Sequence, residues 1–188
     1  MNQRCWPTRV AFLFFYSLLS AAQPAMAMPA QDVQPINNRD YLSRALALID
    51  GAQQHIRVTM YLAQRYGNYA DSPSNRLLGA LANAQARGVD VEVILERSKQ
   101  DDERSRDLNT KNADALKFLS DAGVKVFQDS PAITTHAKVL VVDARYTIIG
   151  STNWTYAALV RNNEAAVLID SPSVAKVYEE MFEEIKRQ

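Results

Sequence analysis

From residue 39 onward, segments with a helical spacing of apolar residues alternate with short apolar segments that are typical of strands. The first such pair is a helix over 41–52 followed by a strand over 55–62. Further helices are predicted over 72–87, 112–122 and 173–187, and further strands over 89–95, 124–128, 138–142 and 146–149. This order predicts one α/β domain that spans residues 39–188.

Two joints between a helix and a strand look alike along the chain. The sequences are ARGVDVEV at 86–93 and DAGVKVFQ at 121–128, and each joins a helix end to a β-branched strand start through a glycine. Repeated helix-then-strand units favour right-handed crossovers and parallel strands. We therefore expect an α/β fold with a mainly parallel or mixed β-sheet flanked by helices.

Two segments carry no clear periodicity. Residues 28–38 are expected to form a loose leading segment before the domain. Residues 98–111 hold eight charges in fourteen positions, four of each sign, and a solvated loop is the expected structure there.

The N-terminal 27 residues have the pattern of a signal peptide. Residues 1–9 carry two arginines and no acidic residue, residues 10–22 are an apolar run, and Ala25 and Ala27 are the small residues that a signal peptidase reads. Cleavage after Ala27 would export the protein to the periplasm or out of the cell. An uncleaved N-terminal anchor is the alternative, although 13 apolar residues are few for a membrane span.

Composition excludes several classes of protein. The chain is 47% hydrophobic, which excludes a disordered chain, and its one cysteine excludes a disulfide scaffold. Lysine and arginine together number 21, as do aspartate and glutamate, so nothing suggests a strongly basic nucleic-acid binder. Removal of residues 1–27 takes away two arginines and leaves 19 basic against 21 acidic residues, a net charge of −2.

Polar residues that could carry chemistry gather between residues 133 and 169. His136 and Lys138 fall on the same side of a predicted strand, whereas Val139 and Val141 point the other way into apolar packing. The polar segment after Gly150 would place two further side chains on a common face if it is extended, and these are Ser151 and Asn153.

This region resembles the signature of the phospholipase D superfamily of phosphodiesterases. The residues that carry the resemblance are His136-x-Lys138-x4-Asp143, Gly150-Ser151-x-Asn153 and Glu164. In size and in its single motif, the chain resembles the Nuc-like bacterial endonucleases. The resemblance implies an α-β-α sandwich, with the motif region at 130–164, and hydrolysis through a covalent phosphohistidine without a metal ion or other cofactor.

The resemblance also implies a role for each motif residue. His136 would be the nucleophile, which must be neutral to attack phosphorus, and Glu164 would be its acidic orienting partner. Lys138 and Asn153 would bind the phosphate oxygens, and Ser151 would add a hydroxyl donor or shape the loop. Asp143 and Gly150 are expected to be structural, because Asp143 falls at a normal hairpin position.

One histidine cannot supply both the nucleophile and the general acid that the leaving oxygen needs. The only other histidine, His55, has Arg57 at the lysine position of the motif but Leu62 at its aspartate position, and we interpret it as a structural residue. The resemblance therefore implies a homodimer, with the active site at the two-fold interface and one His136 from each subunit.

Nearby aromatic and basic residues are candidates for substrate binding. Trp154 could stack on a base, or it could equally be a core residue. Arg65 and Tyr66, together with Tyr61 and Tyr69, follow the first strand of the domain and could form a substrate wall or simply pack.

Three functions remain open at this point. An exported, non-specific endonuclease that cleaves DNA or RNA ranks first, because of the small size and the single motif. A phospholipase D that acts on phosphatidylcholine-type lipids ranks second, since no amphipathic lid is evident. A non-catalytic binding module ranks third, because all motif residues are intact. No metal-ligand pattern is visible in the sequence.

Overall fold

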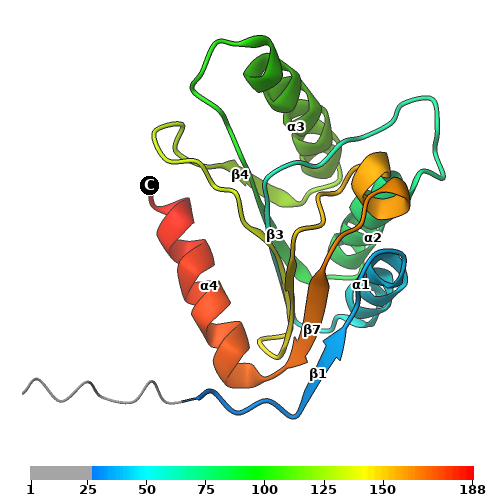
Figure 1. Ribbon diagram of the computed structural model, residues 1–188, viewed down its shortest axis with the longest axis vertical. Helices are drawn as coiled ribbons and strands as arrows, with labels where there is room; N and C mark the ends of the chain where they lie inside the picture. The colour runs from blue at the N-terminus through cyan, green and yellow to red at the C-terminus, as the bar shows by residue number, and fades with distance from the viewer. Residues whose placement is uncertain (1–26) are drawn as a thin grey trace, which may run out of the picture.

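Within the part of the chain that the structure describes, seven strands form one sheet, and helices flank it on both sides (Figure 1). The computed structural model describes residues 27–188, so the predicted signal peptide lies outside the described residues except for Ala27. The strands are β1 (Asp32–Pro35), β2 (His55–Met60), β3 (Asp90–Leu95), β4 (Lys125–Gln128), β5 (Lys138–Val142), β6 (Tyr146–Gly150) and β7 (Ala166–Asp170). The helices are α1 (Asp40–Gly51), α2 (Pro73–Ala86), α3 (Glu103–Asp121), the short π-helix η1 (Ala157–Arg161) and α4 (Pro172–Lys186).

The sheet is mixed, with the strand order β1-β7-β6-β5-β2-β3-β4. Only β2, β3 and β4 are parallel to one another, and they are connected by the two glycine joints that the sequence singled out. The other four pairings are antiparallel. A mixed sheet flanked by helices is thus confirmed, but its parallel part is confined to three strands because β5 pairs antiparallel with β2.

Each face of the sheet packs against different helices. Helices α1, α2 and α3 cover one face and contribute to the large core, whereas α4 alone lies against the other (Figure 1). Val139 and Val141 of β5 pack against Ala175 of α4, and the alternate residues Leu140 and Val142 join the large core. The alternation predicted for β5 is therefore present, and it defines the two faces.

Local signals explain where several helices begin. Ser72 precedes Pro73, and its side chain accepts a hydrogen bond from the Asn75 amide; Ser171 caps α4 in the same way before Pro172. At the joints after α2 and α3, Gly88 and Gly123 have φ of 92° and 82°, a conformation that favours glycine. These signals explain why those helix bounds were predictable.

The prediction of a loop over residues 98–111 is wrong for most of that segment. Helix α3 begins at Glu103, and the Asp102 side chain caps it by accepting a hydrogen bond from the Ser105 amide at 2.9 Å. The mixed charges that suggested a loop instead stabilise the exposed side of a helix, as in the ion pair of Lys111 with Asp107 four residues earlier.

The leading segment 28–38 also contains regular structure. Strand β1 pairs antiparallel with β7, with Val33 opposite Ile169. The sequence pattern predicts neither strand. Strand β1 is only four residues long, and β7 directly follows the motif region, whose residues were interpreted as functional. Only the tertiary pairing reveals β1, since it satisfies the backbone of the β7 edge.

Candidate functional site

One edge of the sheet collects most of the residues of the motif. Strand β5 runs antiparallel to β2, so Lys138 at its start pairs with Met60 at the end of β2. Strand β6 ends at the same edge, where Gly150 pairs with Ala166 at the start of β7. The segments that carry His136, Ser151, Asn153 and Glu164 therefore all leave the sheet on one side. We call this side the motif edge.

His136, Lys138 and Tyr61 contact one another at the motif edge. The rings of Tyr61 and His136 meet edge to face with centroids 4.5 Å apart, and Lys138 Nζ lies 4.7 Å from the centre of the Tyr61 ring. Lys138 Nζ donates a hydrogen bond to the carbonyl oxygen of His136 at 2.6 Å. Tyr61, a candidate for the substrate wall, thus directly supports both motif residues.

The charges of His136 and Lys138 influence each other. Desolvation, followed by the positive charge of Lys138, lowers the pKa of the exposed His136 below its ordinary value of 6.5. Burial lowers the pKa of Lys138 to about 8, although the charge of Glu164 opposes this shift. His136 is therefore mostly neutral at pH 7 while Lys138 keeps its charge, and a histidine nucleophile next to a phosphate needs both states.

Glu164 is held by residues that surround it on three sides. Its carboxylate accepts hydrogen bonds from the Ser151 hydroxyl and from Asn162 Nδ2, and its amide donates to Asn38 Oδ1 at 2.7 Å. In the described single chain, Glu164 does not hydrogen-bond to His136. Its expected role as the orienting partner of His136 stays a prediction, whereas its bond to Ser151 is a feature of the structure.

Two further motif residues have clear structural surroundings. A Cβ at Gly150 would lie 2.4 Å from the carbonyl oxygen of Ala165, so only glycine allows β6 to approach this residue so closely. Asn153 Oδ1 is buried and has no hydrogen-bond partner among the described residues. A buried amide oxygen without a partner is costly in a purely structural role.

Asp143 and His55 lie at the opposite edge of the sheet, which we call the hairpin edge. Asp143, with φ of 53°, begins the hairpin turn after β5, and its carboxylate accepts hydrogen bonds from the amides of Gln53, Gln54 and His55. His55 Nε2 is hydrogen-bonded to Glu179 Oε1 of α4 at 2.6 Å. Both side chains thus form hydrogen bonds within the fold, and the structural roles expected for them stay predictions.

One candidate for substrate binding, Trp154, is wrong. Trp154 is only 1% exposed, and its indole N–H donates to the Tyr41 hydroxyl inside the core, so it cannot stack on a base. Arg65 is exposed, and its guanidinium lies 5.0 Å from the centre of the Phe118 ring of α3, in a hollow against α2, so its role in substrate binding stays a prediction. Both residues were singled out by type, but tertiary packing determines which surface each one reaches.

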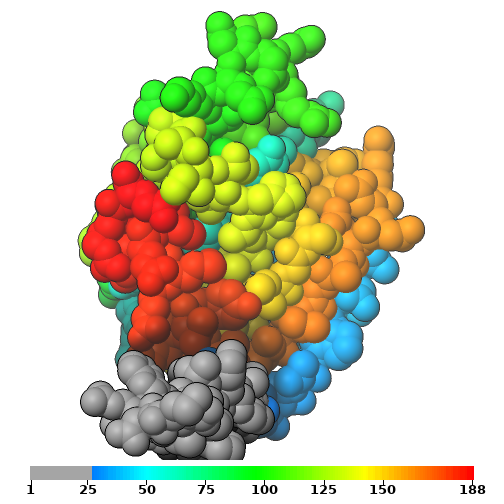
Figure 2. All heavy atoms as spheres, turned by 60° about the vertical axis from the view of Figure 1, so that its left-hand side comes forward, coloured from blue at the N-terminus to red at the C-terminus, as the bar shows by residue number. Residues whose placement is uncertain are grey.

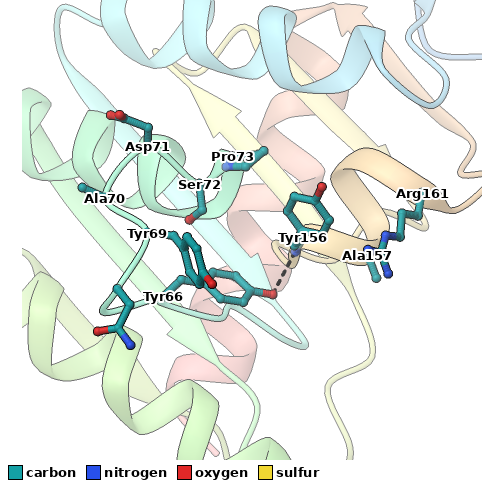
Figure 3. Close-up of a pocket in the computed structure, with 10 residues that line it drawn as sticks. Tyr66, Tyr69, Ala70, Asp71, Ser72, Pro73, Tyr156, Ala157 and Arg161 are labelled. Atoms are coloured by element: carbon teal, nitrogen blue, oxygen red, sulfur yellow. Dashed lines mark hydrogen bonds between the residues drawn. The ribbon is translucent and has the colours of Figure 1, made fainter.

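Tyr66, in contrast, lines an open pocket of about 830 Å³ between the loop after β2 and η1. Figure 3 shows Tyr66 and Tyr69 on one side of the pocket and Tyr156 and Arg161 on the other. The Tyr66 hydroxyl accepts a hydrogen bond from the Tyr156 amide and so joins the two walls. Tyr156 and Arg161 were not predicted, because they follow the motif segment without forming a pattern of their own.

Asn112 is another residue at the motif edge that the sequence pattern does not predict. This fully buried residue of α3 donates to the carbonyl oxygens of Tyr61 and Glu96 and accepts from the Ala63 amide, so it joins the ends of β2 and β3. A polar residue on the buried side of a predicted helix is the signal that could have found it.

Residues 27–188 contain neither a metal-ligand cluster nor a membrane-spanning helix. No group of three or more histidine, cysteine, aspartate or glutamate side chains there could hold a metal ion. In the same part of the chain, no helix is both long and apolar enough to cross a membrane.

A family model described as "Cardiolipin synthase, PLD-like domain" matches residues 45–186, which include the whole motif edge. The chain belongs to the phospholipase D superfamily. Members of this superfamily are phosphodiesterase hydrolases, as the resemblance of the motif implied.

Relatives within the superfamily differ in name. Phospholipase D of Rickettsia typhi is 36% identical over 99 residues, which are 53% of this chain and 44% of that protein, so the chain spans less than half of that relative. Mitochondrial cardiolipin hydrolase of Xenopus laevis is 28% identical over 92% of this chain and 74% of its own length. The crystal structure of Nuc from Salmonella typhimurium, a phospholipase D family member, matches with a TM-score of 0.69 and 26% identity over 84% of this chain and 95% of that one.

Proposed function

We propose that this chain hydrolyses phosphodiester bonds with His136 as the nucleophile. The observation that carries the proposal is the exposed, neutral imidazole of His136 beside the buried, charged Lys138 at the motif edge. Attack of an imidazole nitrogen forms a P–N bond and breaks the bond from phosphorus to the leaving oxygen. Water then attacks phosphorus, releases the imidazole and completes the hydrolysis. Lys138 and Asn153 stabilise the charge on the phosphoryl oxygens.

The leaving oxygen needs a proton, and a second subunit is the proposed source. His55 is tied to Glu179 at the hairpin edge and cannot reach the motif edge. In a two-fold dimer, the partner subunit's His136 would protonate the leaving oxygen and later take a proton from the attacking water. The negative phosphate favours the charged form of that second imidazole. We expect a dimer in solution and an inactive monomer.

Nucleic acid is the proposed substrate. The pocket of Tyr66, Tyr69, Tyr156 and Arg161 supports this choice, because it presents aromatic rings and a guanidinium close in sequence to the Ser151–Asn153 segment. Aromatic side chains stack on bases irrespective of sequence, and arginine adds a cationic contact. Similarity to Nuc over 95% of that chain also supports the choice. We expect endonuclease activity with little sequence preference.

A phospholipid is the second candidate substrate. The similarity to cardiolipin hydrolase over 92% of this chain favours it, and so does the name of the Rickettsia relatives. The same His136 chemistry would release a headgroup from a lipid phosphodiester. In that case, the tyrosine pocket would hold part of the lipid instead of a base.

One assay separates these substrates and tests the metal-independent reaction. The purified protein is incubated with single-stranded DNA, double-stranded DNA, RNA, and vesicles of phosphatidylcholine or cardiolipin, all in EDTA. We expect nucleic acid to be cleaved, and an acid quench to trap phosphate on His136. Cleavage of lipid alone would contradict the choice of substrate. Activity that EDTA abolishes and magnesium restores would contradict the mechanism.

We also propose that the protein is exported to the periplasm or beyond. The support is the pattern of residues 1–27 in the sequence. Mass spectrometry of the protein recovered from fractionated cells would show a chain that begins at Met28. A full-length chain in the membrane fraction would instead indicate an anchor.

A further inference from the structure

A pair of buried carboxyl groups holds the residue before His136. Glu96 follows β3 and is 2% exposed, and Asp129 follows β4 and is 5% exposed. The amide of Thr135 donates to both, with distances of 2.6 Å to Glu96 Oε2 and 3.2 Å to Asp129 Oδ2. The two carboxyl groups therefore share one N–H, and that N–H belongs to the neighbour of the proposed nucleophile.

The pair is itself fixed to the sheet. The second oxygen of Asp129 accepts from the Arg97 amide at 2.7 Å, and the amides of Glu96 and Asp129 donate to the carbonyl oxygens of Met60 and Leu95. On the other side, residues 131–134 are exposed and Thr135 is the first buried residue of the segment. The shared hydrogen bond is thus where the exposed segment before His136 is attached to the sheet. In Figure 2, the surface of this yellow segment lies between red α4 and the orange segment that follows β6.

The pair cannot readily carry two negative charges. Burial, together with the hydrogen bond that protonated Glu96 donates to Asp129, raises the pKa of Glu96 to about 7. Among residues 27–188, no lysine, arginine or histidine lies within salt-bridge distance of either carboxyl group. Two adjacent buried carboxyl groups without a cation retain one proton between them.

Charged groups on the neighbouring elements have other partners. Arg57 of β2 pairs with Asp90, Lys125 of β4 with Asp90 and Glu92, and Lys186 of α4 with Glu92, whereas Lys138 of β5 donates to the His136 carbonyl. The pKa of His136 responds to burial and to Lys138, and neither Glu96 nor Asp129 contributes to it. Any influence of the pair on His136 therefore acts through the backbone at Thr135.

We propose that Glu96 and Asp129 are positioning residues that hold the His136 segment by binding the Thr135 amide, and that they do so only while they share a proton. This inference rests on the proposed function of His136 as the nucleophile. When the shared proton is lost, the two carboxylates repel each other and the Thr135 N–H loses one of its acceptors. The imidazole is then free to move away from the phosphate, and a displacement of about 1 Å can lower a rate about 100-fold.

The sign of the pH effect follows from the raised pKa of Glu96. Its neutral form is favoured in the folded protein, so the stability it contributes is complete below its ordinary pKa of 4.5 and is lost as pH rises towards about 7. Activity should fall over the upper part of the same range. The expected pH profile of kcat therefore has an alkaline limb near pH 7, below the pKa of about 8 of Lys138.

The first test needs no activity. In the NMR spectrum of the full protein, the amide shift of Thr135 should titrate with a midpoint near pH 7. In Glu96→Gln, the amide group donates to Asp129 and its carbonyl accepts from Thr135, so this titration should disappear. A Thr135 amide that does not titrate in the wild-type protein would overturn the proposal.

The second test measures kcat and KM on bis(4-nitrophenyl) phosphate from pH 5 to 9. Glu96→Gln should keep kcat at pH 6 within about threefold and move the alkaline limb up towards pH 8, whereas Glu96→Ala should lower kcat about 10- to 100-fold with little change in KM. Asp143→Ala, which removes a carboxylate at the hairpin edge, is the destabilised control and should not move the limb.

The outcomes distinguish the two proposals. An unshifted alkaline limb in Glu96→Gln, or an unchanged kcat in Glu96→Ala, would overturn the positioning role. If the wild-type protein and His136→Ala cleave the diester equally slowly, the proposed function fails. The NMR titration then still decides whether the pair holds the segment.

Discussion

The two edges of the sheet hold the same kinds of side chain in opposite situations. At the hairpin edge, His55 is hydrogen-bonded to Glu179, and the Asp143 carboxylate accepts from three backbone amides. At the motif edge, His136 is exposed and has no carboxylate partner within the described chain, and Lys138 is only 6% exposed without an ion pair. The same strand, β5, connects the two edges.

This difference separates structural from functional polar residues. Polar groups that only stabilise the fold have their hydrogen-bonding capacity filled within the chain. At the motif edge, burial without a full set of partners lowers the pKa of Lys138 to about 8, and Asn153 Oδ1 is left without a partner among the described residues. A bound phosphate diester would supply a negative charge and acceptor oxygens for Lys138. Four predictions test this contrast.

Substitution of the two histidines by alanine should produce the largest difference in kcat. His136→Ala should lower kcat on the order of 10⁴-fold, because it removes the nucleophile. His55→Ala should change kcat less than about threefold and mainly lower the melting temperature, since it removes an ordinary ion pair. Steady-state kinetics and thermal melts of both variants check this. Equal losses of activity in the two would contradict the contrast between the edges.

Lys138 should have the next largest effect. Lys138→Met keeps the volume of the side chain but removes the charge beside the phosphate, and kcat should fall about 10²- to 10³-fold. Lys125→Met removes an exposed lysine that pairs with Asp90 and should leave kcat unchanged. The comparison uses kcat at pH 6.

The glutamates of the two edges form a third matched pair. Glu164→Gln removes the negative charge that supports protonation of Lys138 and should lower kcat about tenfold. Glu179→Gln should leave kcat unchanged and cost at most about 1 kcal/mol of stability, because its bond to His55 is partly exposed. Urea unfolding alongside the kinetic assay separates the two effects.

Asp143 should affect stability alone. Asp143→Ala leaves three backbone amides without their acceptor and should lower the free energy of unfolding by about 1–3 kcal/mol. Asp143→Asn keeps a side-chain carbonyl oxygen and tolerates the positive φ, so its free energy of unfolding should fall by a smaller amount. The activity per folded molecule should stay constant in both, and a loss of kcat without a loss of stability would place Asp143 in the reaction.

Much of the fold could be predicted from local signals. The glycine joints marked the C-terminal ends of α2 and α3, because such signals act within a few residues. The start of α3 and the strands β1 and β7 could not be found in this way. Charge composition does not distinguish an exposed helix from a loop, and a four-residue strand exists only because it pairs with another.

The sequence by itself determined the residues of the motif, which are a histidine, a lysine, a serine, an asparagine and a glutamate in the order typical of phospholipase D proteins, and with them the family to which the chain belongs. Only the tertiary structure decided which polar residues are close in space. It brought Tyr61 against His136, buried Trp154 in the core, and joined Glu96 and Asp129 at the Thr135 amide. The physical reason is that hydrogen bonding and burial depend on contacts between distant strands, and side-chain type alone does not specify those contacts.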